Sequence, residues 1–244
     1  MSFLIIETVI SGLIVASAFP IGAVIAIYAN YSHAKKALFA AFGAGIFLSA
    51  TMLLIQETLN LGNVFDLLIG FSLGALAFGI AQHFFKHDSN SNSGSVSKRY
   101  SAGKLSVIGT ILDSVPESLF IGVLIALQEP GLFTAETVLF LGNLAATLEG
   151  AKIMQKQGIK RSMIMRDWLI DFVIVALAAP IGYFLAKNVI QDFVATILGF
   201  AAGTLVVFVA GELISRAYRE STGHAEDFAI SLGFLIGIVL LFVI

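Results

Sequence analysis

Residues 105–127 read LSVIGTILDSVPESLFIGVLIAL, and this stretch decides the fold. A helix needs about 20 mostly apolar residues to cross the hydrocarbon core of a bilayer, and this run is long enough. The chain holds eight such stretches, at residues 4–28, 37–56, 64–85, 105–127, 133–153, 168–187, 192–214 and 226–244. We therefore expect an all-α integral membrane protein with eight transmembrane helices.

The composition agrees with a lipid-exposed surface. Of the 244 residues 58% are hydrophobic and 12% charged, against about 25% charged in an ordinary soluble domain. The net charge of -2 gives no reason to expect nucleic acid, and the absence of cysteine excludes a disulfide or thiolate site. The spans leave no room for a second domain, so residues 1–244 form one polytopic domain. Residues 86–104, rich in Ser, Asn and Gly, are expected to be a flexible loop.

The basic residues predict the orientation. All Lys and Arg except Lys187 lie in or beside the odd-numbered loops, whereas the even-numbered loops carry Glu57, Asp66, Glu129 and Asp192. Cytoplasmic loops are enriched in Lys and Arg. The odd loops, including 86–104, are therefore expected in the cytoplasm, with both termini outside a cell membrane (inner or plasma). The first span lacks the basic segment of a signal peptide and is expected to be retained.

Three short motifs recur at nearly the same offset. Pro20-Ile21-Gly22 recurs as Pro180-Ile181-Gly182, Phe42-x-x-Gly45 as Phe200-x-x-Gly203, and Ser72-Leu73-Gly74 as Ser231-Leu232-Gly233. They pair spans 1–3 with spans 6–8, which begin on opposite sides of the membrane. Chance recurrence in glycine-rich sequence is the alternative, but three motifs in register favour an inverted repeat around spans 4 and 5, as in secondary transporters.

The two unmatched spans hold the unusual polar residues. Asp113 and Glu117 lie four residues apart, so they share a face of span 4, about 6 Å apart along the axis. Ser114 borders that face, and Pro116 leaves a helix carbonyl without its usual donor. Span 5 adds Glu149. Together these groups form a patch rich in oxygen ligands.

The charges favour a bound cation. No Lys or Arg lies in the middle of a span, and carboxylates this close together cannot all stay ionised in a low dielectric. Either some are protonated and tie helices together, or a cation offsets them. Carboxylate, hydroxyl, carbonyl and water oxygens suit a divalent metal ion, and intramembrane acids usually mark ion or proton paths. Asp113, Ser114, Glu117 and Glu149 are therefore the predicted metal ligands.

Five further residues are weaker candidates for a vestibule. Glu57 and Glu212 lie near span ends, where a solvated carboxylate is the common alternative. Asp171, one turn inside span 6, either reaches the interface or has a function. His83 and His87 flank the third loop, where most histidines are simply solvated.

Spans 4 and 5 resemble the ZIP family of divalent metal transporters. That family has a His-Asn-x-Pro-Glu-Gly motif in span 4 and a similar motif in span 5. The matching segments here are Asp113-Ser114-Val115-Pro116-Glu117-Ser118 and Ala145-Ala146-Thr147-Leu148-Glu149-Gly150, with further similarity at Gly43-Ala44-Gly45 through Glu57, Ala179-Pro180-Ile181-Gly182, and Gly199 through Glu212-Leu213-Ile214. The resemblance covers nearly the whole chain. It implies eight spans, outward termini, movement of spans 1, 4, 5 and 6 against the rest, and a homodimer.

The departures from the family are specific. Asp113 replaces the family's histidine and Ser114 its asparagine, while Ala145, Ala146, Leu148 and Ala179 replace two polar ligands, a proline and a glutamate. The resemblance therefore implies one metal ion held mostly by carboxylates. Loss of imidazole favours manganese or magnesium over zinc, although zinc and iron remain candidate substrates.

The leading hypothesis is a ZIP-like transporter of a divalent metal cation. The alternative is a non-transporting ZIP-like membrane protein, regulatory or structural, whose metal site has degenerated. The sequence contains no Ser/His or His/Glu pair at catalytic spacing, so we do not expect an enzyme. The expected partners are the lipid bilayer, the metal ion and a second copy of the chain.

Overall fold

The computed structural model describes residues 2–29, 33–89, 96–128, 132–188, 191–220 and 224–243. Within these ranges the chain is helical and contains no strand. The helices are α1 (Ser2–Ala16), α2 (Ala18–Tyr28), α3 (His33–Leu61), α4 (Val64–Ser89), α5 (Val96–Leu127), α6 (Leu132–Lys156), α7 (Arg161–Asn188), α8 (Gln191–Phe208), a π-helical turn η1 (Val209–Ile214), α9 (Ser215–Glu220) and α10 (Ala225–Val243). Each of the eight expected stretches falls on one or more of these helices.

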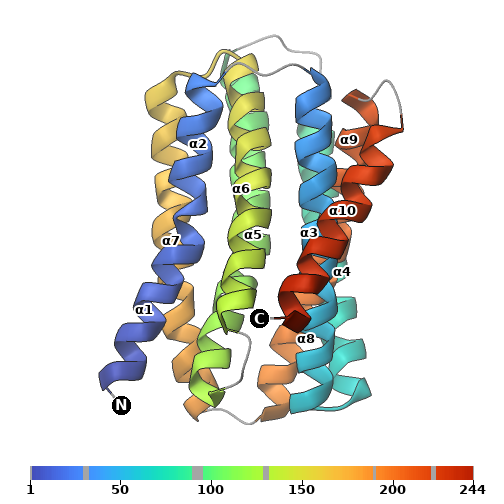
Figure 1. The fold of residues 1–244 in the computed structure, drawn as a ribbon. Coiled ribbons are helices and arrows are strands. Elements are labelled where there is room, and N and C mark those ends of the chain that lie inside the picture. The colour runs from blue at the N-terminus through green and yellow to red at the C-terminus, as the bar shows by residue number, and fades with distance from the viewer. Residues whose placement is uncertain are drawn as a thin grey trace.

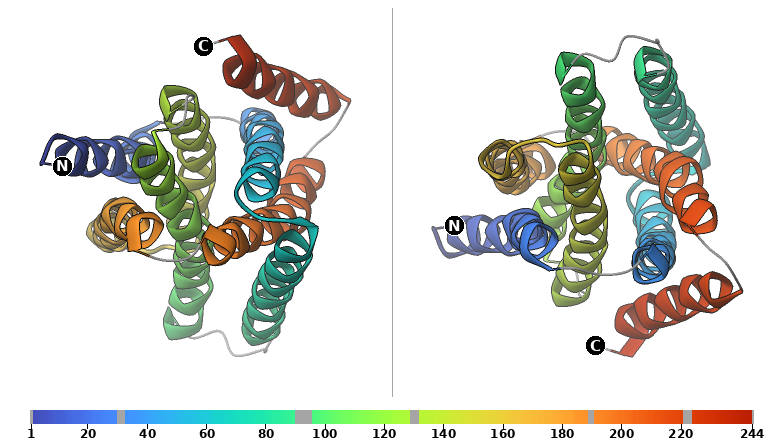
Figure 2. Two further views of the ribbon diagram at one scale, coloured as in Figure 1. Left: turned by 90° about the horizontal axis from the view of Figure 1, so that it is seen from below. Right: turned by 90° about the horizontal axis from the view of Figure 1, so that it is seen from above.

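The long helices stand side by side and alternate in direction (Figure 1). The N-terminus lies at the lower end in this view, and α10 runs back toward that end. The upper end is where α6 finishes and α7 begins, and it carries Lys156, Lys160 and Arg161. We call it the basic end. Seen along the bundle, α5 and α6 lie between α1, α2 and α7 on one side and the remaining helices on the other (Figure 2).

The surface and length of these helices indicate a membrane-embedded protein. In the part of the chain that is described, four stretches are long and apolar enough to cross a membrane: Phe3–Tyr28, Ala37–Leu61, Arg161–Asn188 and Asp192–Arg219. Val64–Ile80 and Ser114–Leu127 are shorter apolar helices. Large apolar side chains such as Phe65, Leu177 and Phe228 are exposed on the outside. Lipid is the solvent that suits such a surface.

Two boundaries differ from those expected. The first span is bent where α1 ends and α2 begins, because Pro20 has no N–H to donate to the carbonyl of Ala16. At the same place the Ser17 hydroxyl donates to the carbonyl of Ile14 at 2.6 Å. Much of the predicted 86–104 loop is helical, since α4 continues to Ser89 and α5 starts at Val96. The apolar content of the sequence indicates where a helix leaves the lipid. The helical backbone hydrogen bonds continue beyond that point, so the helix ends later than the apolar stretch does. Residues 90–95 lie outside the described ranges.

Glycines bring several helix pairs into backbone contact, among them α3–α10 and α4–α8. A methyl group on Gly45 of α3 would collide with the carbonyl of Ile230 in α10. In the same way, a methyl on Gly203 of α8 would collide with the carbonyl of Phe71 in α4. Contacts this close need a residue without Cβ, as is common where membrane helices pack. The pairs α3–α10 and α4–α8 are thus held at short range.

Candidate metal site between α5 and α6

The middle of the site is the α5 segment around Pro116. Ser114, Glu117 and Ser118 on this segment are each 0% exposed. Pro116 stays inside the helix but removes one backbone donor, which leaves an extra carbonyl oxygen on this turn. A carboxylate and two hydroxyls are therefore buried together in the otherwise apolar segment Ser114–Leu127.

Asn143 of α6 joins these groups. The Ser114 hydroxyl donates to Asn143 Oδ1 at 2.9 Å, and Asn143 Nδ2 donates to Glu117 Oε2 at 3.2 Å. Asn143 is itself 0% exposed, and its backbone carbonyl accepts a 2.7 Å hydrogen bond from the Thr147 hydroxyl. The side chains of Ser114, Asn143 and Glu117 thus form one cluster across the α5–α6 contact, which we call the central cluster.

Glu149 comes from another face of α6. It lies six residues beyond Asn143, so the two side chains point in directions about 120° apart around the helix. Glu149 is half-buried, near the face where Gly142 meets the ring of Phe47 in α3. Its role as a metal ligand stays a prediction.

Asp113 lies on α5, one turn before Glu117, but its side chain is outside the described part of the structure. Among the side chains that are described, no three carboxylate or imidazole groups gather as a ready-made metal centre. The central cluster therefore offers a metal ion one carboxylate, one amide and one hydroxyl. Asp113, which directly precedes Ser114 in the sequence, is predicted to add a second carboxylate.

The vestibule candidates are dispersed. Asp171 of α7 is 0% exposed. Its side chain therefore does not extend to the membrane–water interface, which was one of its two interpretations from the sequence. Glu57 on α3 is half-buried and accepts a 3.5 Å hydrogen bond from Asn60. Glu212 is half-buried within the π-helical turn η1, an irregularity that is frequent at functional sites. His83 on α4 is exposed, and the side chain of His87 lies outside the described ones.

Three buried polar residues escaped the sequence reasoning. Asn143 was overlooked because it is uncharged. An amide in the middle of an apolar span is the feature of the sequence that could have identified it. Asp167 was overlooked because it precedes the sixth span as marked, yet it is 4% exposed and pairs with Arg166 at 2.7 Å. Glu136 near the start of α6 is 9% exposed. For all three, the signal was a polar residue at a position that helix periodicity makes internal.

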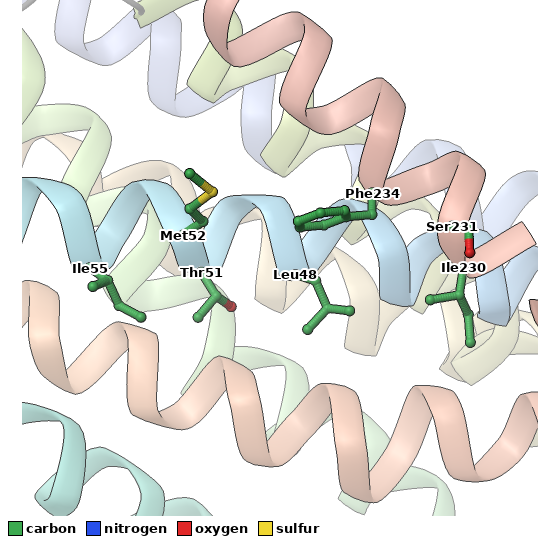
Figure 3. Close-up of a pocket in the computed structure, with 7 residues that line it drawn as sticks. All are labelled: Leu48, Thr51, Met52, Ile55, Ile230, Ser231 and Phe234. Atoms are coloured by element: carbon green, nitrogen blue, oxygen red, sulfur yellow. The ribbon is translucent and has the colours of Figure 1, made fainter.

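An apolar groove of about 550 Å³ lies between α3 and α10 (Figure 3). Its lining residues are Leu48, Thr51, Met52, Ile55, Ile230, Ser231 and Phe234. The Thr51 hydroxyl bonds the carbonyl of Phe47, and that of Ser231 bonds the carbonyl of Asp227. Both hydroxyls are thus used within their own helices, and the groove suits lipid better than an ion.

Comparison with known proteins gives no family assignment. No protein-family model matches the chain, and no curated protein matches it either.

Proposed function

We propose that the protein is a secondary transporter that moves a divalent metal cation through a site between α5 and α6. The observation that carries the proposal is Glu117, a fully buried carboxylate in an apolar helix, bonded to an amide from a second helix. Ionisable residues in such positions are costly and usually belong to a path for ions or protons.

The donor set favours a hard cation. Glu117 supplies carboxylate oxygens, Ser114 a hydroxyl and Asn143 an amide whose oxygen can turn toward an ion. With Asp113 and Glu149 as the predicted additional ligands, the site offers oxygen atoms without imidazole or thiolate. Such a set suits manganese or magnesium better than zinc.

The packing supports the proposed inverted repeat. Gly45 of α3 touches α10, and Gly203 of α8, its counterpart in the repeat, touches α4. The repeat pairs α3 with α8 and α4 with α10, so these two contacts are equivalent. Gly22 likewise faces Thr147 of α6, and Gly182 faces Leu119 of α5. Equivalent contacts on both sides of α5 and α6 fit alternating access around a central site.

The remaining parts of the proposal rest on the sequence. The charge distribution supports eight spans in a cell membrane with the basic end in the cytoplasm and both termini outside. The motifs of spans 4 and 5 support divergent membership of the ZIP family, and with it a homodimer.

Glu117→Gln tests the proposal directly. The change keeps the shape of the side chain and removes one charged ligand. In wild-type protein, Mn²⁺ at a hundred times its dissociation constant should stabilise the fold by about 2.7 kcal/mol, which raises the melting temperature by about 5–10 °C. Glu117→Gln should abolish this shift and Mn²⁺ uptake into proteoliposomes, with its metal-free melting temperature close to that of wild type. The matched control is Asp192→Asn, which removes an exposed carboxylate from the first turn of α8.

A second function has one observation in its favour. The bonds that Asn143 makes to Glu117 and Ser114 are also those of a protonated acid that ties two helices together. A non-transporting protein with a degenerate site predicts that no divalent metal in a panel of Mn²⁺, Mg²⁺, Zn²⁺ and Fe²⁺ changes the melting temperature. That result, with a nearly silent Glu117→Gln, would rule out the transporter.

A further inference from the structure

Two buried polar groups on α7 have no hydrogen-bond partner in the part of the chain that the structure describes. Asp171 is 0% exposed, and neither of its carboxylate oxygens has a hydrogen-bond partner among the described residues. The indole Nε1 of Trp168, three residues earlier and also 0% exposed, has no partner there either. Nearly all buried polar groups are bonded to protein, water or an ion. An acceptor and a donor for which the described residues supply no partner, about 4.5 Å apart along one helix, indicate a site for water or an ion.

The register of α7 against α5 puts this position beside the central cluster. The Ser118 hydroxyl donates to the carbonyl of Val175 at 2.7 Å. Four residues further along both helices, Gly122 of α5 meets the backbone of Ala179 in α7, so the two helices run in parallel. One turn before this bond, Asp171 therefore lies level with Ser114, whose hydroxyl belongs to the central cluster.

Asp171 also points toward α5. It lies eleven residues before Gly182, which is three helical turns within about 20°. Gly182 packs directly on the backbone of Leu119 in α5, so Asp171 is on the same face of α7. The opposite side of α7 carries exposed Leu169, Val173 and Leu177.

A further carboxylate leads from Asp171 to the basic end. Asp167 lies one turn closer to that end, is 4% exposed, and accepts two hydrogen bonds from the guanidinium of Arg166. Arg166 is largely exposed at the side chain, 55%. Glu117, Asp171 and Asp167 thus follow one another from the buried centre to solvent at the basic end.

We propose that Asp171 is a second binding station for the transported divalent cation, between the central cluster and the basic end. The inference rests on the proposed transport function and adds a residue and a direction to it. Its carboxylate accepts the cation as it leaves Glu117 and Ser114, and water bridges Asp171 and Trp168 when the station is empty. The competing account is a protonated acid that only packs α7 against α5.

The test separates binding from transport. Purified wild-type protein, Asp171→Asn, Asp171→Glu and the control Asp192→Asn are compared by calorimetry with Mn²⁺ and by Mn²⁺ uptake into proteoliposomes. Asp171→Asn should bind Mn²⁺ at the central cluster within about threefold of the wild-type affinity, because the ligands of that cluster are unchanged. It should transport Mn²⁺ about tenfold more slowly or worse, because the step from the central cluster toward the basic end is impaired. Asp171→Glu, which restores the charge, should recover part of the rate.

Two results would overturn the second station. One is Asp171→Asn transport at the wild-type rate, and the other is a loss of Mn²⁺ affinity that equals the loss of rate, which would make Asp171 part of the central site. Wild-type protein that neither binds nor transports Mn²⁺ would instead refute the proposed function itself.

A measurement on wild-type protein covers the case in which Asp171→Asn fails to fold. An apolar carbodiimide labels buried carboxyl groups, and peptide mass spectrometry then reads the labelling of Asp171. Increasing Mn²⁺ should protect Asp171 over the concentration range in which Mn²⁺ raises the melting temperature. Labelling that saturating Mn²⁺ leaves unchanged would also contradict the proposal.

Discussion

Asn143→Leu is the change that most directly tests the α5–α6 contact. Leucine has the branched shape and the number of side-chain heavy atoms of asparagine and a higher helix propensity, so the substitution removes polar contacts without leaving a cavity. It abolishes the bond that Ser114 donates to Asn143 and the bond that Asn143 donates to Glu117. Both former partners are 0% exposed, so water does not readily replace the lost bonds.

The expected cost follows from those two bonds. Side-chain hydrogen bonds between membrane helices contribute about 0.6 kcal/mol on average and up to about 1.7 kcal/mol. Loss of both should therefore lower the free energy of unfolding by about 1–3 kcal/mol. For a chain of this size each kcal/mol corresponds to about 2–4 °C, so the metal-free melting temperature should fall by about 2–12 °C. Ser114→Ala removes only one of the bonds and should cost less.

Thermal unfolding of metal-free protein in detergent, followed by circular dichroism, measures these shifts. Thr147→Val is the matched control, because the Thr147 hydroxyl bonds the backbone of its own helix and its loss should change the melting temperature by little. The double variant with Asn143→Leu and Ser114→Ala should cost less than the sum of the single changes, since they share a bond. Strict additivity, or an Asn143→Leu protein as stable as wild type, would show that the central cluster does not hold α5 to α6.

Gly203→Ala and Gly79→Ala make the same chemical change in different surroundings. A methyl on Gly203 collides with α4, whereas one on Gly79 meets no atom within 4 Å. Thermal unfolding should show a loss of about 1–3 kcal/mol for Gly203→Ala and a gain of up to about 1 kcal/mol for Gly79→Ala; equal shifts would contradict a tight α4–α8 contact. For orientation, an impermeant thiol reagent should not label Ser93→Cys in intact cells, because the charge distribution predicts that residues 86–104 face the cytoplasm. Labelling from outside would reverse the proposed topology.

The sequence predicted the helices well because their signal is local. Length and apolar content alone located every long helix. The spacing of Asp113 and Glu117, with Ser114 beside them, predicted a polar patch on span 4; Ser114 and Glu117 are buried in the structure, and the side chain of Asp113 lies outside the described ones. The exact helix ends were less predictable. The 86–104 segment is polar enough to look like a loop, yet helical hydrogen bonds extend into it to Ser89 and from Val96.

The partner of Glu117 was not predictable in the same way. Which face of α6 meets α5 depends on how both helices pack against their other neighbours, and this information is spread over the whole chain. Reasoning by charge selected Glu149, which stays a prediction, and did not select the neutral Asn143, which donates a hydrogen bond to Glu117. Asp167 was overlooked for a related reason, because the span was marked by hydropathy and so began one residue too late to include it.

The contacts of α5 suggest where this protein moves. Toward α7, α5 is in backbone contact at Gly122 and Gly182, and such contacts do not loosen without separating the helices. Toward α6, the two hydrogen bonds of the central cluster run through the side chain of Asn143, which can change partners by rotation. We therefore expect α5 and α7 to move as one unit and the α5–α6 contact to be the joint, which differs from the movement of spans 1, 4, 5 and 6 as one unit that the family resemblance implies. A cation that binds Glu117 and Ser114 would break their hydrogen bonds to Asn143 and so loosen the α5–α6 contact. Cation binding and opening would then both depend on these two hydrogen bonds.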